Sequence, residues 1–124
     1  MKVTNGEIFG SIQAFQEIVK VELPVKTSWM LAKLASKVDA RFKSIEKVRT
    51  GLVMKFGTPN EETGQTEIKP GSDNWVEFVA GYNELMEQED EIDMEKISIP
   101  EEVNGKPIMV SAGILAALEK FIEV

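Results

Sequence analysis

PVKTSWMLAKLASKVDARFKSIEKVRTGLVMKFG, residues 24–57, is the stretch that decides the fold of this chain. No proline follows Pro24 within it, and Gly51 is the only glycine before Gly57. Apolar residues recur every three or four positions over about four heptads, at Leu31, Leu34, Val38, Phe42, Ile45, Val48, Leu52 and Phe56. This repeat predicts one long amphipathic helix from Pro24 to Phe56, which ends at Gly57 and the Thr58-Pro59-Asn60 turn.

The predicted helix is longer than the rest of the chain can cover. Its 33 or so residues span roughly 50 Å, whereas a compact domain of this length has a radius of gyration of about 14 Å. The apolar stripe is therefore either the chain's own core or, in part, an interface that needs a partner. The overhang favours a homo-oligomer or another protein partner, bound through a predicted seam that comprises Trp29, Leu31, Leu34, Val38, Phe42, Ile45, Val48, Leu52 and Phe56. We expect Trp29 to be a partly buried core residue, with an interface anchor as the alternative.

Shorter elements are predicted on both sides of the long helix. Thr4 or Asn5 caps a first helix that ends near Val21 and buries one face, made of Ile8, Ile12, Phe15 and Val19. Residues 58–72 predict a polar connection with a short strand within 65–69. Asn74 and Glu77 then predict a capping box for a third helix, which ends near residue 89 and whose apolar face comprises Trp75, Phe78, Val79, Tyr82, Leu85 and Met86.

The last third of the chain mixes strand and helix signals. Residues 92–99 alternate as a strand does, but the alternation shifts at Glu95-Lys96, which predicts a bulge or a bend. Asn104-Gly105 predicts a tight β-hairpin. Ser111 can cap a final helix with one apolar face, made of Leu115, Leu118 and Ile122, beside Phe121.

These signals together predict a mostly α fold, either all-α or α+β. One long helix packs with two or three shorter helices and a small β-hairpin, in a single domain over residues 1–124. The composition, 43% apolar and 28% charged, is that of an ordinary globular protein.

Composition also excludes several kinds of chemistry. The 124 residues include no cysteine and no histidine, which removes disulfides, thiolates, cysteine-based zinc sites and the commonest general base. No apolar run approaches the roughly 20 residues that cross a bilayer, and the first residues lack the apolar region of a secretory signal. We therefore expect a cytoplasmic protein without a membrane partner, a cofactor or a metal.

Basic and acidic residues are concentrated in different parts of the chain. Residues 24–57 carry eight lysines and arginines against two acids, a net charge of +6, whereas residues 58–102 carry 14 acids against two lysines, a net charge of −12. The total of −7 argues against binding to nucleic acid. The basic stripe of the long helix is expected either to pair with the third helix or to remain solvated, rather than to contact phosphates.

An acidic run between residues 84 and 95 is the most prominent candidate site. Glu84-x-x-Glu87 and Asp90-x-x-Asp93 are similar to the paired acidic motifs of all-α nucleotide pyrophosphohydrolases. Those enzymes carry the two motifs on separate helices, whereas here both fall in one stretch. The EF-hand pattern fails because its glycine is missing. The run therefore predicts a solvated face or an acidic interaction surface, made of Glu84, Glu87, Asp90, Glu91 and Asp93.

No catalytic residue is predicted. The serines have no histidine to activate them. The glycines form neither of the phosphate-binding motifs G-x-G-x-x-G and G-x-x-x-x-G-K-[ST].

Two further stretches carry a resemblance to a known family. Leu23-Pro24-Val25-Lys26-Thr27 leads into Met30-Leu31-Ala32-Lys33-Leu34, and residues 111–122 read SAGILAALEKFI. In this order and at this chain length they resemble an uncharacterised family of small acidic proteins from tailed bacteriophages and prophages. The resemblance implies a viral protein that acts in the host cytoplasm or is associated with the virion. It implies no activity and no catalytic residue.

Three hypotheses follow from the sequence. The first is a non-enzymatic phage or prophage protein that acts through protein–protein interaction, such as an assembly chaperone or a minor structural adaptor. The second is an acidic mimic that inhibits a host nucleic-acid enzyme through residues 84–95. The third is a carboxylate-metal nucleotide hydrolase.

Overall fold

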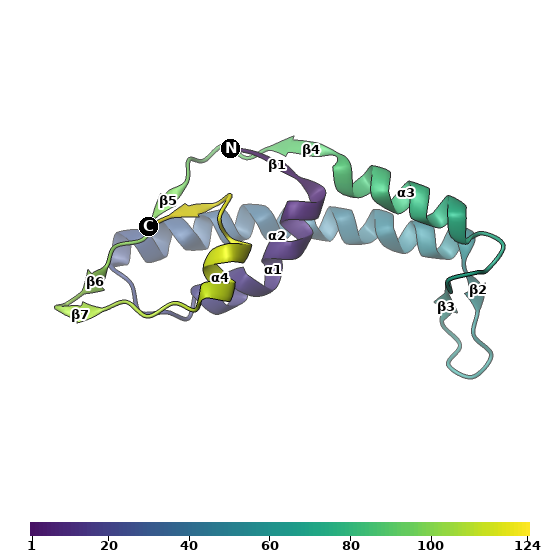
Figure 1. Cartoon of the computed structure of the whole chain (residues 1–124), viewed down its shortest axis with the longest axis horizontal. Coiled ribbons are helices and arrows are strands. Elements are labelled where there is room, and N and C mark those ends of the chain that lie inside the picture. The colour runs from purple at the N-terminus through teal and green to yellow at the C-terminus, as the bar shows by residue number, and fades with distance from the viewer.

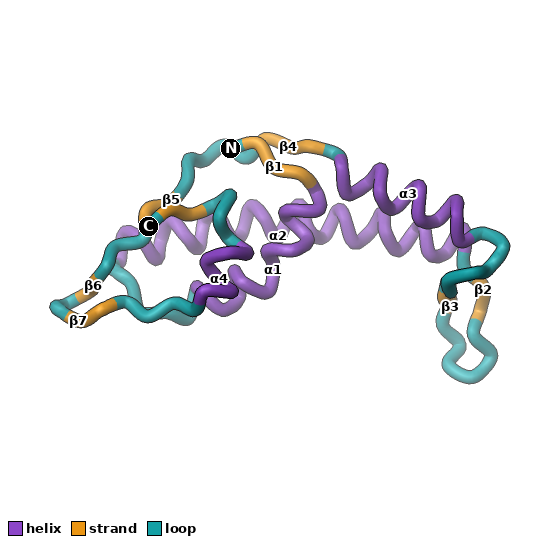
Figure 2. The backbone as a smooth tube through the Cα atoms, viewed as in Figure 1, coloured by secondary structure: helices purple, strands orange, loops and turns teal.

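Four helices and eight short strands form the structure, a computed structural model that describes residues 1–124 (Figure 2). The helices are α1 (Asn5–Ile18), α2 (Val25–Phe56), α3 (Trp75–Glu87) and α4 (Ala112–Ala117). The strands are β1 (Lys2–Thr4), β2 (Thr58–Pro59), β3 (Thr66–Glu67), β4 (Glu89–Glu91), β5 (Ile97–Ser98), β6 (Glu102–Val103), β7 (Lys106–Pro107) and β8 (Ile122–Glu123). One long helix, shorter helices and small β-hairpins are thus present, and the predicted fold class is confirmed.

Helix α2 runs along most of the molecule and divides it into two parts (Figure 1). The N-terminal part of α2 packs with α1 and β5, and α4 packs on α1; we call residues 1–45 and 88–124 the body. The C-terminal part of α2 lies beside α3 and ends at the β2–β3 hairpin; we call residues 46–87 the arm. The predicted limits of α2 are correct, because Pro24 is its N-cap and Gly57 its C-cap.

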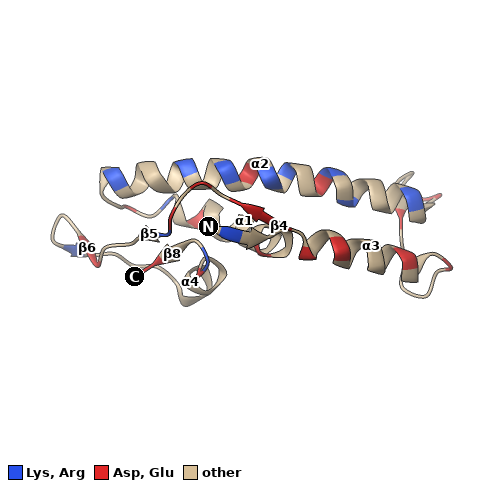
Figure 3. Cartoon of the chain, turned by 90° about the horizontal axis from the view of Figure 1, so that it is seen from above, with Lys and Arg blue, Asp and Glu red and all other residues tan.

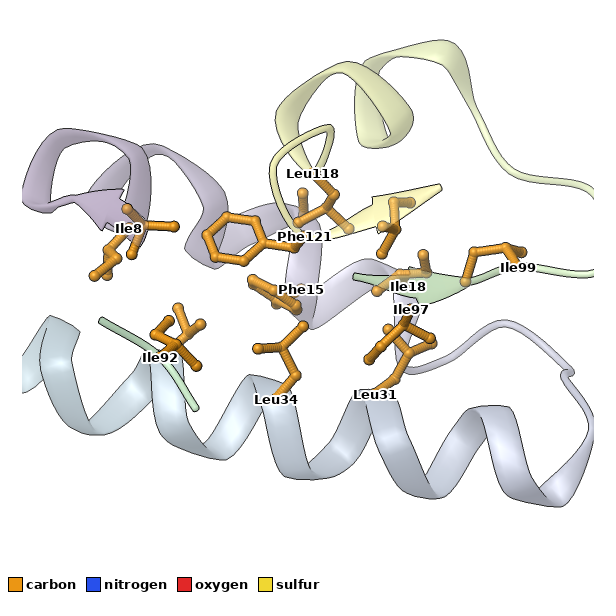
Figure 4. Close-up of a cluster of buried hydrophobic side chains, with 14 of the residues drawn as sticks. Ile8, Phe15, Ile18, Leu31, Leu34, Ile92, Ile97, Ile99, Leu118 and Phe121 are labelled. Atoms are coloured by element: carbon orange, nitrogen blue, oxygen red, sulfur yellow. The ribbon is translucent and has the colours of Figure 1, made fainter. Parts of the chain in front are cut away.

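The hydrophobic core lies in the body. It contains 16 buried apolar residues, contributed by α1, α2 and the segments that follow α3 and α4. Phe121 is among the largest fully buried side chains. Its ring meets that of Phe15 edge to face, with centroids 5.1 Å apart (Figure 4). This geometry is favourable between aromatic rings, so the two residues join α1 to the C-terminal segment.

Two strand pairs connect segments that are far apart in the sequence. β1 pairs antiparallel with β4, so that Lys2 lies opposite Glu91. β5 pairs parallel with β8, so that Ile97 lies opposite Ile122. The other two pairs are the local hairpins β2–β3 and β6–β7. The predicted turn between β6 and β7 is confirmed.

The φ angles of that turn explain its sequence. Asn104 has a φ of 53° and Gly105 a φ of 78°. Both lie in the left-handed region that a type I′ turn requires and that asparagine and glycine tolerate best.

Helix α1 buries Ile8 and Phe15 as predicted, but its buried face extends over Ser11 and Ile18 rather than over Ile12 and Val19. Ile8, Phe15 and Ile18 are buried with Ser11, whereas Val19 is 49% exposed. Ser11 fits in the core because it is small and because its hydroxyl donates to the carbonyl oxygen of Ile8 over 2.8 Å. A satisfied hydroxyl costs little to bury. Helix α1 can therefore turn Ser11 and Ile18 inward.

Trp29 is exposed, and the prediction of a partly buried core residue is wrong. Its side chain is 63% exposed, and the ammonium of Lys33 lies 5.6 Å from the ring centroid. Leu31 is buried two positions later. Two residues turn an α-helix by about 200°, so the face that buries Leu31 directs Trp29 away from the core.

Three smaller predictions also change. Asn74 makes no side-chain cap on α3; its amide donates instead to the carbonyl oxygen of Phe56, 3.3 Å away. Helix α4 ends at Ala117, and Ile122 lies in β8 rather than on a helical face. The bend in the 92–99 segment falls at residues 93–94, just before the predicted position.

Candidate interaction surfaces

The predicted seam divides between the body and the arm. Leu31, Leu34, Val38 and Ile45 are at most 4% exposed and belong to the core of this chain. Phe42 is half-buried, and its ring packs against Phe9 of α1 with centroids 5.4 Å apart. Apart from Trp29, which is exposed, this half of the seam is therefore covered by the chain itself and is not accessible to a partner.

The arm half of the seam is incompletely covered. Val48 is 51% exposed, and Leu52 and Phe56 are half-buried. Helix α3, which packs against them, has no fully buried residue. We give the name arm surface to seven apolar residues, three on α2 and four on α3: Val48, Leu52, Phe56, Trp75, Phe78, Val79 and Tyr82. The structure thus brings the end of the predicted seam together with the apolar face of α3.

Close packing holds the two arm helices together. A side chain at Gly81 would place its Cβ 3.1 Å from Cδ2 of Leu52, so the glycine lets α3 approach α2. Along α3 the rings of Trp75 and Phe78 lie 5.7 Å apart, and those of Phe78 and Tyr82 lie 6.1 Å apart. The arm therefore presents a continuous row of aromatic rings beside Leu52.

Most basic and acidic side chains lie on different elements of the structure, although α2 also carries Asp39 and Glu46. Lysines and arginines lie along α2, and acids lie along α3 and β4 (Figure 3). Only Arg41 joins the two sets: its Nε is 2.7 Å from Oδ2 of Asp90, and its Nη2 donates to the carbonyl oxygen of Glu91. Two other cations of α2 form ion pairs, but their acidic partners lie on α2 itself. The predicted pairing with α3 is therefore not formed, and most of the basic stripe is solvated.

The acidic candidates lie at the end of α3 and along β4. Glu84, Glu87, Asp90, Glu91 and Asp93 are all exposed. The hydrogen bond from Arg41 and the backbone N–H of Glu91 hold the pKa of Asp90 below its ordinary value of 3.8. No group of three or more acidic side chains is arranged to hold a metal ion. The segment is an exposed acidic surface whose β4 acids form three ion pairs, with Arg41, Lys2 and the N-terminal ammonium.

Replacing Arg41 with glutamine is expected to destabilise the fold at neutral pH by up to about 1 kcal/mol, the range for exposed ion pairs. Because the pKa of Asp90 is lowered in the folded state, the contribution of the pair is present above pH 3.8. It is lost as the pH falls through the lowered value. Urea denaturation of both proteins at several pH values measures the difference. A difference that grows on acidification would contradict the assignment, and Lys43→Gln is the matched control.

The seam prediction missed a second apolar surface, which lies between α1 and α2. This α1–α2 groove has a volume of about 430 Å³ and is lined by Ile12, Phe15, Gln16, Val19, Ala32, Ala35, Ser36 and Asp39. A signal for it is present in the sequence: Ile12 and Val19 lie seven positions apart, on a stripe about 100° away from Ile18 around the helix. Val19 and Ile12 therefore remain for a second face.

Comparison with protein-family models, curated proteins and solved structures finds no match. None of the helices combines the length and the apolar character needed to cross a membrane. A function has to be inferred from the surfaces themselves.

Proposed function

We propose that this chain is a non-enzymatic phage or prophage protein that binds other proteins through its arm surface, as an assembly chaperone or a minor structural adaptor. The observation that carries the proposal is the incomplete burial of α3. Its apolar face packs on the end of α2 and, at its C-terminal end, on α1, and none of its residues is fully buried. A pair of helices in this state gains stability when a further helix covers it, because burial of apolar area is favourable by about 25 cal/mol per Å².

The construction of the arm supports a binding role. Helix α2 continues from the core, where Leu31, Leu34 and Val38 are buried, into the arm without interruption. The arm surface is therefore held on a helix that is fixed in the body. A pre-organised surface loses less conformational entropy on binding than a mobile one, so the arm is suited to helix packing with a partner.

The partner is a phage protein or a second copy of this chain. In a homo-oligomer, two arms pack together as a four-helix bundle, in which each arm covers the apolar residues of the other. The phage origin rests on the resemblance of residues 23–34 and 111–122 described above. Host cytoplasm and virion are the two places of action that this origin supports.

Affinity capture of the tagged protein from infected or prophage-induced cells tests the proposal. Replacing Val48 with aspartate is expected to lower recovery of phage head or tail proteins, or of untagged copies, by about tenfold or more, since a buried charge opposes apolar packing. Met54→Asp is the matched control, because Met54 is also on the arm part of α2 and is 62% exposed, but lies outside the arm surface. Val38 and Ile45 are unsuitable for this test because both are buried in the core.

A different set of captured proteins would overturn the proposal. Recovery of a host polymerase, nuclease or repair protein that is released by salt would favour the acidic mimic. In that case Val48→Asp would leave recovery unchanged, and the double variant Glu84→Gln and Glu87→Gln would abolish it.

A further inference from the structure

The α1–α2 groove is continuous with exposed apolar side chains that no part of the chain covers. Val19 lies at its edge on α1 and is half exposed. On α2, Trp29 shares a face with Val25, Ala32 and Ser36, which lie four before, three after and seven after it. Val25 and Trp29 are both exposed. The groove and these residues together form an apolar strip that runs along two helices.

The shape of the strip suits a helix. Its α2 side is lined by the small residues Ala32, Ala35 and Ser36, and the distance between packed helices falls when the side chains at the contact are small. Trp29 stands at one end of this small-residue stretch. Tryptophan is among the side chains that are enriched at the energetic hot spots of protein interfaces.

The charge beside the strip is positive, although the chain as a whole is acidic. Lys26, Lys33 and Lys37 lie at spacings of seven and four, which places them on one stripe of α2 next to Trp29. None of the three has a carboxylate within 4 Å. The one carboxylate in the groove, Asp39, is paired with Lys43 over 3.1 Å. The strip is therefore bordered, beyond Trp29, by cations that form no ion pair, and the ammonium of Lys33 lies over the Trp29 ring.

From this arrangement we propose that the α1–α2 groove docks an amphipathic helix of a partner protein. The apolar side of that helix enters the groove against Trp29, and its flank along α2 is acidic and faces Lys33 and Lys37. Helix-in-groove recognition supplies the affinity through apolar burial, and the charges set which helices are accepted. This site is separate from the arm surface and does not depend on the proposed function.

Two synthetic helical peptides with the same leucine face test the proposal. One carries glutamates along its flanks and the other carries lysines, and binding of each fluorescein-labelled peptide to the full-length protein is measured by fluorescence anisotropy. The glutamate peptide is expected to bind about tenfold or more tightly than the lysine peptide, and Trp29→Ala is expected to weaken it by about tenfold or more. Trp29 is exposed, so this variant is expected to keep the circular dichroism spectrum and Tm of the parent.

Charge reversal separates recognition from general electrostatic attraction. The double variant Lys33→Glu and Lys37→Glu is expected to prefer the lysine peptide. The matched double variant Lys47→Glu and Lys55→Glu, on the arm part of α2, is expected to keep the original preference. Equal binding of both peptides, no binding of either, or reversal in both variants would overturn the proposal.

Two further measurements identify the occupant and separate the two sites. Sedimentation velocity of the protein without peptide tests whether a second copy fills the groove. A dimer that Trp29→Ala dissociates would mean that it does, and we expect no such dimer. Val48→Asp should bind the glutamate peptide as the parent does. Failure of the parent protein to capture phage proteins or its own copies, with peptide binding intact, would contradict the proposed function alone, and capture without peptide binding would contradict the groove proposal alone.

Discussion

Replacing Phe121 with alanine is expected to lower the free energy of unfolding by about 3–5 kcal/mol, the usual cost of emptying a buried phenylalanine site. Phe121 is 1% exposed, and its ring extends from the segment that follows α4 toward Phe15 of α1 (Figure 4). The variant loses the apolar contacts of the ring and its edge-to-face contact with Phe15. Such a loss is large against the 5–15 kcal/mol or so that stabilises a typical domain.

Urea denaturation followed by far-UV circular dichroism measures this loss. The control is Met109→Ala, because Met109 is 80% exposed and its truncation should change stability by no more than about 0.5 kcal/mol. A loss below about 1 kcal/mol for Phe121→Ala would be too small for a filled core site. The assignment of Phe121 to the centre of the core would then be wrong.

The second large effect is expected where α2 meets the β2–β3 hairpin, at Gly57. A Cβ at this position would lie 2.5 Å from the carbonyl oxygen of Val53 and 2.6 Å from that of Glu67. Both neighbours are backbone atoms, so neither can move away as a flexible side chain can. Gly57→Ala is therefore expected to destabilise the protein by about 1–3 kcal/mol, as overpacking does, and to displace the hairpin.

Gly51 provides a control within the same helix, with the opposite expected sign. It lies inside α2, and a Cβ added to it would meet nothing within 4 Å. Gly51→Ala should therefore stabilise the protein by about 0.5–1 kcal/mol, because alanine loses less conformational entropy in a helix. Thermal denaturation of the two variants measures both changes. A change of the same sign in both would contradict this account of the end of α2.

Local signals predicted the parts of the fold that depend on few residues. The limits of α2 follow from Pro24, whose ring fixes its φ angle, and from Gly57, which leaves the helical conformation readily because it has no Cβ. The hairpin at Asn104-Gly105 is likewise determined by the two residues of its turn. Such features are readable because they need no information about the rest of the chain.

Which face each helix buries depends on its neighbours in the folded structure, and these neighbours are not apparent from the sequence. Helix α1 has apolar residues at enough positions to bury either Ile12 and Val19 or Ser11 and Ile18. The second choice is realised because Ser11 satisfies its hydroxyl within α1. The same limit explains Trp29: residues 25–56 carry apolar side chains on more than one face, and only tertiary packing decides which face becomes core.

The division of the seam could not be predicted for a related reason. Its repeat is uniform from Leu31 to Phe56, so it contains no mark of where the body ends. What covers the first half comes from distant segments, among them Ile92, Ile97 and Phe121. The strands that position these segments are only two or three residues long, too short for alternation to reveal them.

The two long-range strand pairs also control when the body can fold during synthesis. β1 must wait for β4, and β5 for β8, so the core is completed only after Ile122 has been added. At about 5–20 residues per second, the nascent chain has Leu34 in place about 4–18 s before its last core residues exist. Throughout that interval the apolar face of α2 lacks its C-terminal cover. Closure of the body is therefore a late event in the synthesis of each molecule.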